Sequence, residues 1–356
     1  MVPREAKTSN WFSEKDPNKP VSAVAKAAIR QRLGTVQFFL PITAKNLDRS
    51  GTRVHQLRVS TRRAQAAMEI FQDVLPELRA RTICKQLKRL RSAASDARDL
   101  DVLYERLSHT TLPTAEARLS RLLDEIVRCR EVAQKPLRKA RKRLKRQEFK
   151  GEIRGLLKRV RWRGEGDEPP FDAVARHAMG SAAGAFFRAA SEALGDPESL
   201  HQLRIAGKRL RYAIELLAPA FPTTLRTELY PVFQEVQERL GRANDHATAC
   251  ELFRKWAGDP RRPQGELLQI LAVDEERSME TSRQEFLNWW TPRREADLRR
   301  RFEAFISGTS LDLVAAPEHT GDLDPGAQCS STNASQGSSF HDDAPTKPAA
   351  TAATIP

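Results

Sequence analysis

Two rows of cationic side chains, each headed by a histidine, are the residues of this chain best suited to chemistry. Residues 54–71 read VHQLRVSTRRAQAAMEIF and residues 200–217 read LHQLRIAGKRLRYAIELL, so one pattern recurs at an offset of 146 with seven identical positions. Arginine forks and lysine ammonium groups at repeated spacing are suited to holding phosphate oxygens. The candidate binding residues on the two segments are His55, Arg58, Arg62, Arg63, His201, Arg204, Lys208, Arg209 and Arg211.

Both segments must be helices for these cations to line up. Neither segment contains a proline, and each ends shortly before one, at Pro76 and Pro219. With a rotation of about 100° per residue, Leu57 and Met68 fall on one side of the first helix and His55 falls on the other. Each segment therefore predicts an amphipathic helix that buries an apolar stripe and presents a row of cations.

Carboxylates near the two rows are expected to orient the cations rather than to catalyse a reaction. Glu69 and Glu215 occupy equivalent positions in the two copies, and Asp99 and Asp245 follow in the next helix of each half. Asp99 has further aspartates beside it, which could suggest a metal site. The second half keeps only Asp245, the counterpart of Asp99, so a metal site is disfavoured. We therefore predict no metal and no cofactor.

The two histidines have two interpretations. Each could donate to a phosphate oxygen, and more strongly below its ordinary pKa of about 6.5. Each could instead be a structural residue that bonds to a neighbouring helix. The recurrence of His55 and His201 at equivalent positions leaves both interpretations open.

The repeat extends beyond these two helices. Residues 25–101 match residues 171–247 at the same offset without an insertion, which indicates internal repeats. Helical periodicity with short connections predicts an all-α fold of two pseudo-symmetric antiparallel four-helix bundles. In the first half we expect one helix over about residues 77–107 and a further one from about residue 114 to beyond residue 130.

Composition divides the chain into a helical domain with two extensions. Residues 1–20 are expected to be a flexible leader, and residues 307–356 a disordered tail that is too polar to bury a core. The helical domain spans residues 21–306. Its expected parts are a first helical half at 21–147, a basic connector at 148–168 and a second helical half at 169–306.

The positive charge is concentrated outside the tail. The net charge is +14, and the residues from Gly308 onward hold six acidic residues against one lysine, so the first 307 residues carry +19 (59 basic less 40 acidic). This balance predicts a polyanionic partner such as nucleic acid, an acidic membrane surface or a phosphate polymer. Residues 135–163 alone hold fourteen Lys or Arg against two Glu. Further candidate contacts in this run are Arg138, Arg141, Lys142 and Lys145.

Cysteine usage and the lack of long apolar runs indicate the compartment. The four cysteines are far apart and show no CxxC spacing, which favours free thiols in a reducing environment. No segment has the length and apolarity of a signal peptide or of a membrane span of about 20 residues. We therefore expect a cytoplasmic protein without a membrane partner.

The two half-motifs resemble the CHAD family, the conserved histidine α-helical domain, over about residues 21–306. They read His55-Gln-Leu-Arg58-Val-Ser-Thr-Arg62-Arg63 with Ala97-Arg98-Asp99-Leu-Asp101, and His201-Gln-Leu-Arg204-Ile-Ala-Gly-Lys208-Arg209 with Gly241-Arg-Ala-Asn244-Asp245. The resemblance implies two bundles related by pseudo-two-fold symmetry, whose basic faces meet at a central cleft. It also implies binding of inorganic polyphosphate and targeting to polyphosphate granules.

The first copy departs from the second at two positions. It has Gln65 where the second has Arg211, and Ser95 where the second half has Gly241. We expect the first half to bind the polyanion less tightly.

A binding module without enzymatic activity is the function that these residues favour. The chain has no phosphate loop, no Ser/His/Asp order and no E-x-E-x-K strand of the triphosphate-tunnel enzymes to which CHAD domains can be fused. The alternatives are an accessory domain of a polyphosphate- or triphosphate-metabolising enzyme and a helical nucleic-acid-binding protein, although no nucleic-acid recognition motif is present. The sequence does not decide the oligomeric state.

Overall fold

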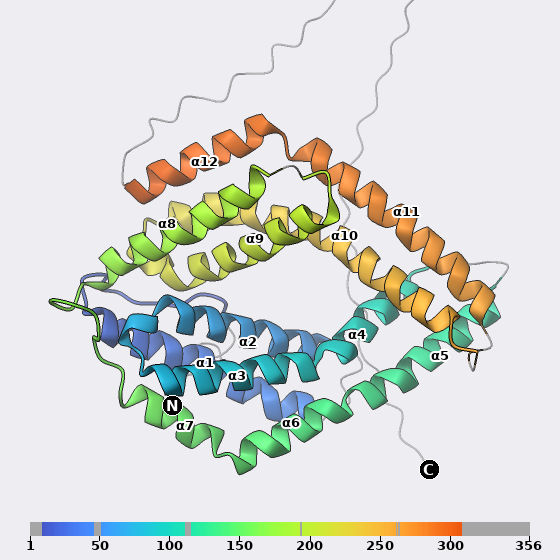
Figure 1. The fold of residues 1–356 in the computed structure, drawn as a ribbon, viewed down its shortest axis with the longest axis horizontal. Helices are drawn as coiled ribbons and strands as arrows, with labels where there is room; N and C mark the ends of the chain where they lie inside the picture. The colour runs from blue at the N-terminus through green and yellow to red at the C-terminus, as the bar shows by residue number, and fades with distance from the viewer. Residues whose placement is uncertain are drawn as a thin grey trace, which may run out of the picture. The chain divides into compact units, whose positions relative to one another are not determined.

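The described part of the chain is helical. The computed structural model describes residues 9–45, 51–110, 115–192, 194–260, 262 and 264–307. In these residues there are helices and no strand, apart from an isolated bridge between Pro20 and Pro170 (Figure 1). The predicted all-α fold is confirmed. The tail from residue 308 and the first part of the leader, residues 1–8, lie outside the described residues.

The first half is organised around the first motif helix. This helix, α2 (Thr52–Ile70), packs against α1 (Val21–Lys45) and α3 (Glu77–Ala93). The helix α6 (Lys135–Arg146) packs on α1 and α3, and α7 (Phe149–Leu157) packs on the same two helices. The segment interpreted as a connector thus contains a helix whose apolar side chains belong to the main core.

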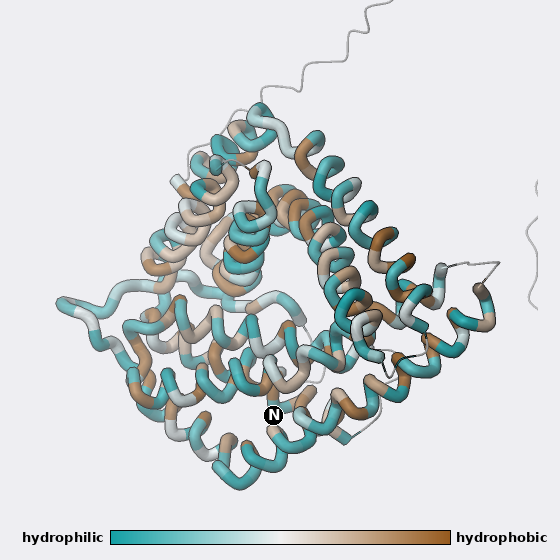
Figure 2. The backbone as a smooth tube through the Cα atoms, turned by 45° about the vertical axis from the view of Figure 1, so that its right-hand side comes forward, coloured by the Kyte–Doolittle hydropathy of each residue, from teal (hydrophilic) through white to brown (hydrophobic). Residues whose placement is uncertain are grey.

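The second half repeats these contacts. The second motif helix, α9 (Pro197–Leu217), packs between α8 (Phe171–Ala190) and α10 (Tyr230–Ala257), as α2 packs between α1 and α3. The helix α12 (Pro292–Ser307) packs on α8, as α6 packs on α1. Hydrophobic residues recur between hydrophilic ones along these helices (Figure 2), which is the pattern of helices that bury one side.

A second, smaller core joins helices of the two halves at their distal ends. It is formed by α4 (Ser95–Ser108), α5 (Glu116–Ala133), α11 (Gly265–Trp289) and the C-terminal part of α10. Three side chains are fully buried there: Leu122 on α5, and Phe253 and Leu268 from the second half. The two repeats therefore contribute side chains to one shared apolar cluster.

Residues 77–107, expected as a single helix, form two helices. The helix α3 ends before Ala94, whose φ of −105° and ψ of 5° leave the helical range, and α4 follows. Arg58 Nη1 donates to the Arg91 carbonyl oxygen at 3.0 Å and to Ser95 Oγ at 2.6 Å. A side chain from α2 therefore satisfies the end of α3. The expectation was wrong because neither proline nor glycine marks this break.

The expected flexible leader needs correction for residues 9–20. Phe12 is buried, and its backbone N–H donates to Glu215 O at 3.0 Å. The Trp11 ring lies 4.7 Å from the Tyr230 ring, and the Arg226 guanidinium lies 4.2 Å from the Trp11 ring centroid. Aromatic side chains therefore attach this segment to the second half.

A buried carboxylate joins the two motif helices. Glu215 of α9 is 0% exposed and accepts two hydrogen bonds from Arg63 of α2, at 2.6 and 2.9 Å. Tyr230 OH donates to the same carboxylate at 2.7 Å, and Arg32 Nη2 donates to the Glu215 carbonyl oxygen at 3.3 Å. We call this group of residues the Glu215 junction.

The junction makes a stability prediction with a matched control. Glu215→Gln should lower the free energy of unfolding by roughly 3–5 kcal/mol, because it leaves the buried Arg63 guanidinium without its counter-charge. Glu69, the equivalent residue on α2, is exposed, and within the described part of the chain its carboxylate accepts only from Gln65 at 2.8 Å. Glu69→Gln should change stability by no more than about 0.5 kcal/mol. Urea denaturation of both variants checks this, and equal effects would contradict it.

Candidate anion-binding site

Local sequence fixes where the two motif helices begin. The helix α2 starts after Gly51, whose φ of 67° is left-handed, and a Cβ there would lie 2.6 Å from Cγ of Asp101. Only glycine fits this position without strain. The helix α9 starts after Asp196, whose side chain accepts the next two free backbone N–H groups at 2.9 and 3.0 Å. These starts set the register of both cationic rows.

The two cationic rows meet at Arg62. Burial lowers the pKa of Arg204 and Lys208 on α9, and the Arg62 guanidinium group on α2 lowers both further. It acts in the same way on Arg58 and His55 of its own helix. We call the residues linked by these interactions the central cationic cluster. Its members are His55, Arg58, Arg62, Arg91, Arg98, Arg204, Lys208 and Arg211.

Two members of this cluster were not among the candidates from the sequence. Burial and then Arg62 lower the pKa of Arg91 on α3, and Arg98 on α4 helps to lower that of His55. Arg98 stands inside the motif quoted above, so the sequence carried a signal for it. Arg91 carried none, because the repeat has Gln237 at the equivalent position.

Burial and repulsion between neighbouring cations lower the pKa values of several groups in the cluster. Burial, followed by Arg204, Arg62 and Arg211, lowers the pKa of Lys208 to about 7. Burial and then Arg62 lower the pKa of Arg58 to about 10. An anion bound among these groups would remove the repulsion and favour the charged forms. The cluster therefore has the electrostatics of an anion site.

Several of these cations have no acidic partner. Among the described residues, Arg62, Arg204 and Lys208 make no ion pair, and the Nε atoms of Arg204 and Arg211 are buried without a hydrogen-bond partner. On α12, by contrast, Arg299 pairs with Glu295 at 2.8 Å. Buried N–H groups are normally satisfied, so the open donors of the cluster indicate a ligand with acceptor oxygens.

Two aspartates lie near the cations without pairing with them. Asp99 on α4 acts on Arg58, and Asp245 on α10 acts on Arg204 and Lys208. Burial raises the pKa of Asp99, and Asp245 contributes to the shift. We expected both aspartates to accept hydrogen bonds from the motif helices, and no such bond occurs within the described residues. The negative charges of these aspartates reduce the positive potential of the cluster.

Both histidines occupy exposed positions at the start of their rows. Partial burial and then Arg98 lower the pKa of His55 to about 4. Because His55 is exposed, the neighbouring cations explain this direction better than burial does. Neither the His55 nor the His201 side chain makes a hydrogen bond to the described part of the chain, so no such contact supports a structural role for them.

Arg63 and Arg209 are equivalent in sequence but differ in environment. Arg63 is bound to Glu215 in the junction, with only 11% of its side chain exposed. It therefore holds the two halves together. Arg209 is exposed. Arg211 lies on the same helix with its Nε 3.9 Å from Glu215, so it connects the junction to the cluster.

A model of the CHAD domain matches residues 27–254 of this chain. The chain belongs to the CHAD family. The crystal structure of the CHAD domain from the plant Ricinus communis has 20% sequence identity and a TM-score of 0.64, and the match covers 83% of this chain and 96% of that one. PptA from Streptomyces chartreusis has 20% identity and a TM-score of 0.52, with 76% and 99% covered. No curated protein matches.

The basic run of this CHAD protein forms a separate surface on α6. Arg138, Lys142 and Lys145 are exposed, and Arg141 is half-buried. The helix packs on α1, α3, α5 and α7 through buried residues that include Leu137 and Leu144. Its cations are therefore solvated and spread along one face, unlike the half-buried cations of the cluster.

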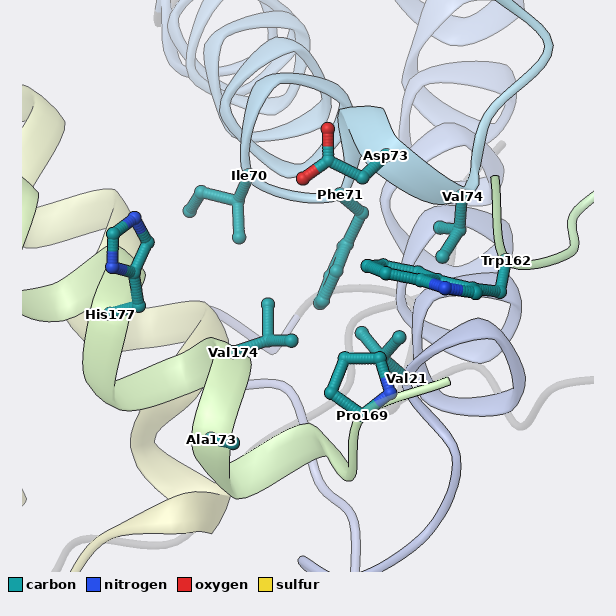
Figure 3. Close-up of a pocket in the computed structure, with 10 residues that line it drawn as sticks. All are labelled: Val21, Ile70, Phe71, Asp73, Val74, Trp162, Pro169, Ala173, Val174 and His177. Carbon is teal, nitrogen blue, oxygen red and sulfur yellow. The ribbon is translucent and has the colours of Figure 1, made fainter. Parts of the chain in front are cut away.

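An apolar pocket lies apart from the cationic residues of the CHAD domain. It has a volume of about 230 Å³, and its walls include Phe71, Trp162 and Val174. Asp73 and His177 stand on its polar edge (Figure 3). No member of the central cationic cluster lines it, so we exclude it from the anion site.

The described residues offer no metal centre. They contain no group of three or more His, Cys, Asp or Glu side chains arranged to hold a metal ion. Asp101, one of the aspartates considered from the sequence, pairs with Arg130. Within the same part of the chain, no helix combines the length and apolarity that crossing a membrane requires.

The state of Lys208 is directly measurable. In an NMR titration of isotope-labelled lysines, Lys208 should titrate with a pKa of about 7, well below the ordinary lysine value of about 10.4. Arg62→Gln should raise the pKa of Lys208 because it removes a repelling charge. Asp245→Asn should lower it further. Titration of Lys208 near the ordinary lysine value of about 10.4 would contradict the proximity of these cations.

Proposed function

We propose that this CHAD protein binds inorganic polyphosphate in the central cationic cluster and that binding recruits it to polyphosphate granules. The observation that carries the proposal is the group formed by Arg62, Arg204 and Lys208. These cations come from two repeats and make no ion pair among the described residues, and burial together with Arg62 lowers the pKa of Arg204 and Lys208. A flexible chain with roughly one negative charge per phosphate supplies the missing charge at repeated spacing.

The side chains of the cluster have distinct roles in this proposal. Arg204 and Arg211 donate from their half-buried guanidinium groups to phosphate oxygens, and Lys208 adds a point charge between them. Arg62 contacts the same chain from the opposite helix. Arg58 Nη1 already donates to the Arg91 carbonyl oxygen and to Ser95 Oγ. Arg58 therefore shapes the site and binds phosphate more weakly than Arg204 does. This supports tighter binding by the second half.

The chemistry of the cluster favours polyphosphate over single-stranded nucleic acid. Nucleic-acid grooves of that kind combine cations with open aromatic faces on which bases stack. Tyr212, the aromatic residue next to Arg211, is buried, and its ring lies 5.9 Å from the Arg63 and 5.7 Å from the Arg211 guanidinium. The ring is thus occupied by cations of the protein itself.

Charge reversal tests the proposal. Arg204→Glu with Lys208→Glu should weaken polyphosphate binding well over tenfold, since each charge-assisted contact contributes roughly 1.5–3 kcal/mol. Helix content should be retained because both positions lie off the apolar stripe. Neutralising the cations of residues 138–146 should have a smaller effect.

For the wild type, the logarithm of affinity should fall steeply with the logarithm of salt concentration.

Competition and the comparison of variants give the contrary outcomes. Long polyphosphate should displace DNA at equal phosphate concentration. Preferential retention of DNA would favour the nucleic-acid alternative. If the double variant binds like wild type while the 138–146 variant fails, α6 carries the binding and the central cluster does not.

We also propose that the site binds without hydrolysing its ligand. Among the described residues near Arg62 and Lys208, none pairs a positioned base with a nucleophile, and a histidine with a pKa of about 4 is a weak base. Purified protein incubated with polyphosphate should release no orthophosphate above buffer. Release that disappears in a His55→Ala or His201→Ala variant would show that the chain is an enzyme.

A further inference from the structure

We propose that Lys208 is a site of covalent acylation by acyl phosphates, small anions whose phosphate is held by the guanidinium groups around this lysine. The modification itself requires only an anion-binding cluster. Its effect on polyphosphate binding rests on the proposed function. Acetyl phosphate is the simplest member of this class and serves as the probe.

The position of Lys208 brings an amine and several guanidinium groups together. Arg204 precedes it by four residues and Arg211 follows it by three, which places both beside it on α9. Arg62 faces it from α2, and Asp245 acts on it from α10. Lys208 is half-buried, and no carboxylate among the described residues forms an ion pair with it. Its amine is therefore held in a cationic site without being neutralised.

This environment makes the amine nucleophilic. A lysine reacts through its neutral form, and a desolvated position beside other cations is one of the arrangements that raise the neutral fraction. With a pKa lowered to about 7, Lys208 is about half neutral at neutral pH. A lysine with the ordinary pKa of about 10.4 is almost entirely protonated under the same conditions.

The same cations select the substrate class. The guanidinium groups of Arg204 and Arg211 are half-buried rather than sealed, so their accessible N–H groups can donate to the oxygens of a phosphate group. An acyl phosphate places its carbonyl carbon one bridging oxygen away from that phosphate. Binding of the phosphate therefore brings the electrophilic carbon within reach of the Lys208 amine.

The reaction is balanced without a further reactant. The Nζ lone pair attacks the carbonyl carbon, the bond from that carbon to the bridging oxygen breaks, and orthophosphate leaves with the electron pair. The proton lost by the nitrogen passes to the departing phosphate or to solvent. No group is oxidised or reduced. The guanidinium groups stabilise the charge that develops on the leaving phosphate.

Acylation would reduce the positive charge of the cluster. The amide that forms on Lys208 is neutral and larger than the amine, and it occupies space between Arg204 and Arg211. If the cluster holds polyphosphate as proposed, acylated protein should bind the polymer several-fold more weakly, since one charged contact is lost. The modification would then link polyphosphate binding to the supply of activated acyl groups.

Peptide mass spectrometry of the full chain tests the inference. Wild-type protein is incubated with acetyl phosphate near pH 7.5, and initial acetylation rates are compared between Lys208 and the exposed lysines Lys139 and Lys142. Lys208 should react at least about tenfold faster, because of its larger neutral fraction and bound phosphate. A rate at Lys208 equal to or below that of the α6 lysines would overturn the proposal.

A variant and a separate binding assay test whether the surrounding cations cause the selectivity. Arg62→Gln should slow acetylation of Lys208 several-fold and leave Lys139 unchanged, with helix content checked by circular dichroism. An unchanged rate at Lys208 in this variant would also overturn the proposal. Polyphosphate affinity of unmodified protein is measured independently. Selective acetylation without polyphosphate binding would reject only the proposed function, and binding without selective acetylation would reject only this inference.

Discussion

The buried carboxylate of Glu215 is the interaction on which the arrangement of the two repeats depends. A carboxylate without access to water is tolerated only when its charge and lone pairs are satisfied. Arg63 from the other repeat and Tyr230 together meet this requirement. The partners of Glu215 thus fix how α2 lies against α9. The cationic rows on those two helices face each other as a consequence of that docking.

The duplicated sequence does not produce duplicated contacts. Glu69 and Arg209 stand where Glu215 and Arg63 stand in the opposite copies, yet both are exposed. Arg63 and Glu215 pair with each other in the junction, where the Phe12 backbone N–H also donates to the Glu215 carbonyl oxygen. The remaining cations of both copies stay available to a ligand. Broken symmetry therefore separates the residues that hold the halves from those of the proposed binding site.

The sequence predicted the features that depend on helical periodicity. It did not predict those that depend on contacts with other helices. The helices, the repeat and the alignment of the cations along each motif helix follow from spacing along the chain, since a helical period tells which residues share a side. It does not tell what that side meets. The break at Ala94 is stabilised by Arg58 from another helix, Arg63 is buried by a distant glutamate, and Arg91 joins the cluster through tertiary packing alone. None of these has a local signature.

The distal core has a consequence for how the duplicated chain must fold. It draws α4 and α5 from the first repeat and α10 and α11 from the second, so neither repeat possesses all of its own interior. Leu122 would be left facing water in an isolated first repeat, and Phe253 in an isolated second one. The evolutionary unit is the repeat, but the unit of cooperative folding is the pair, and excision of either repeat exposes apolar surface on the other.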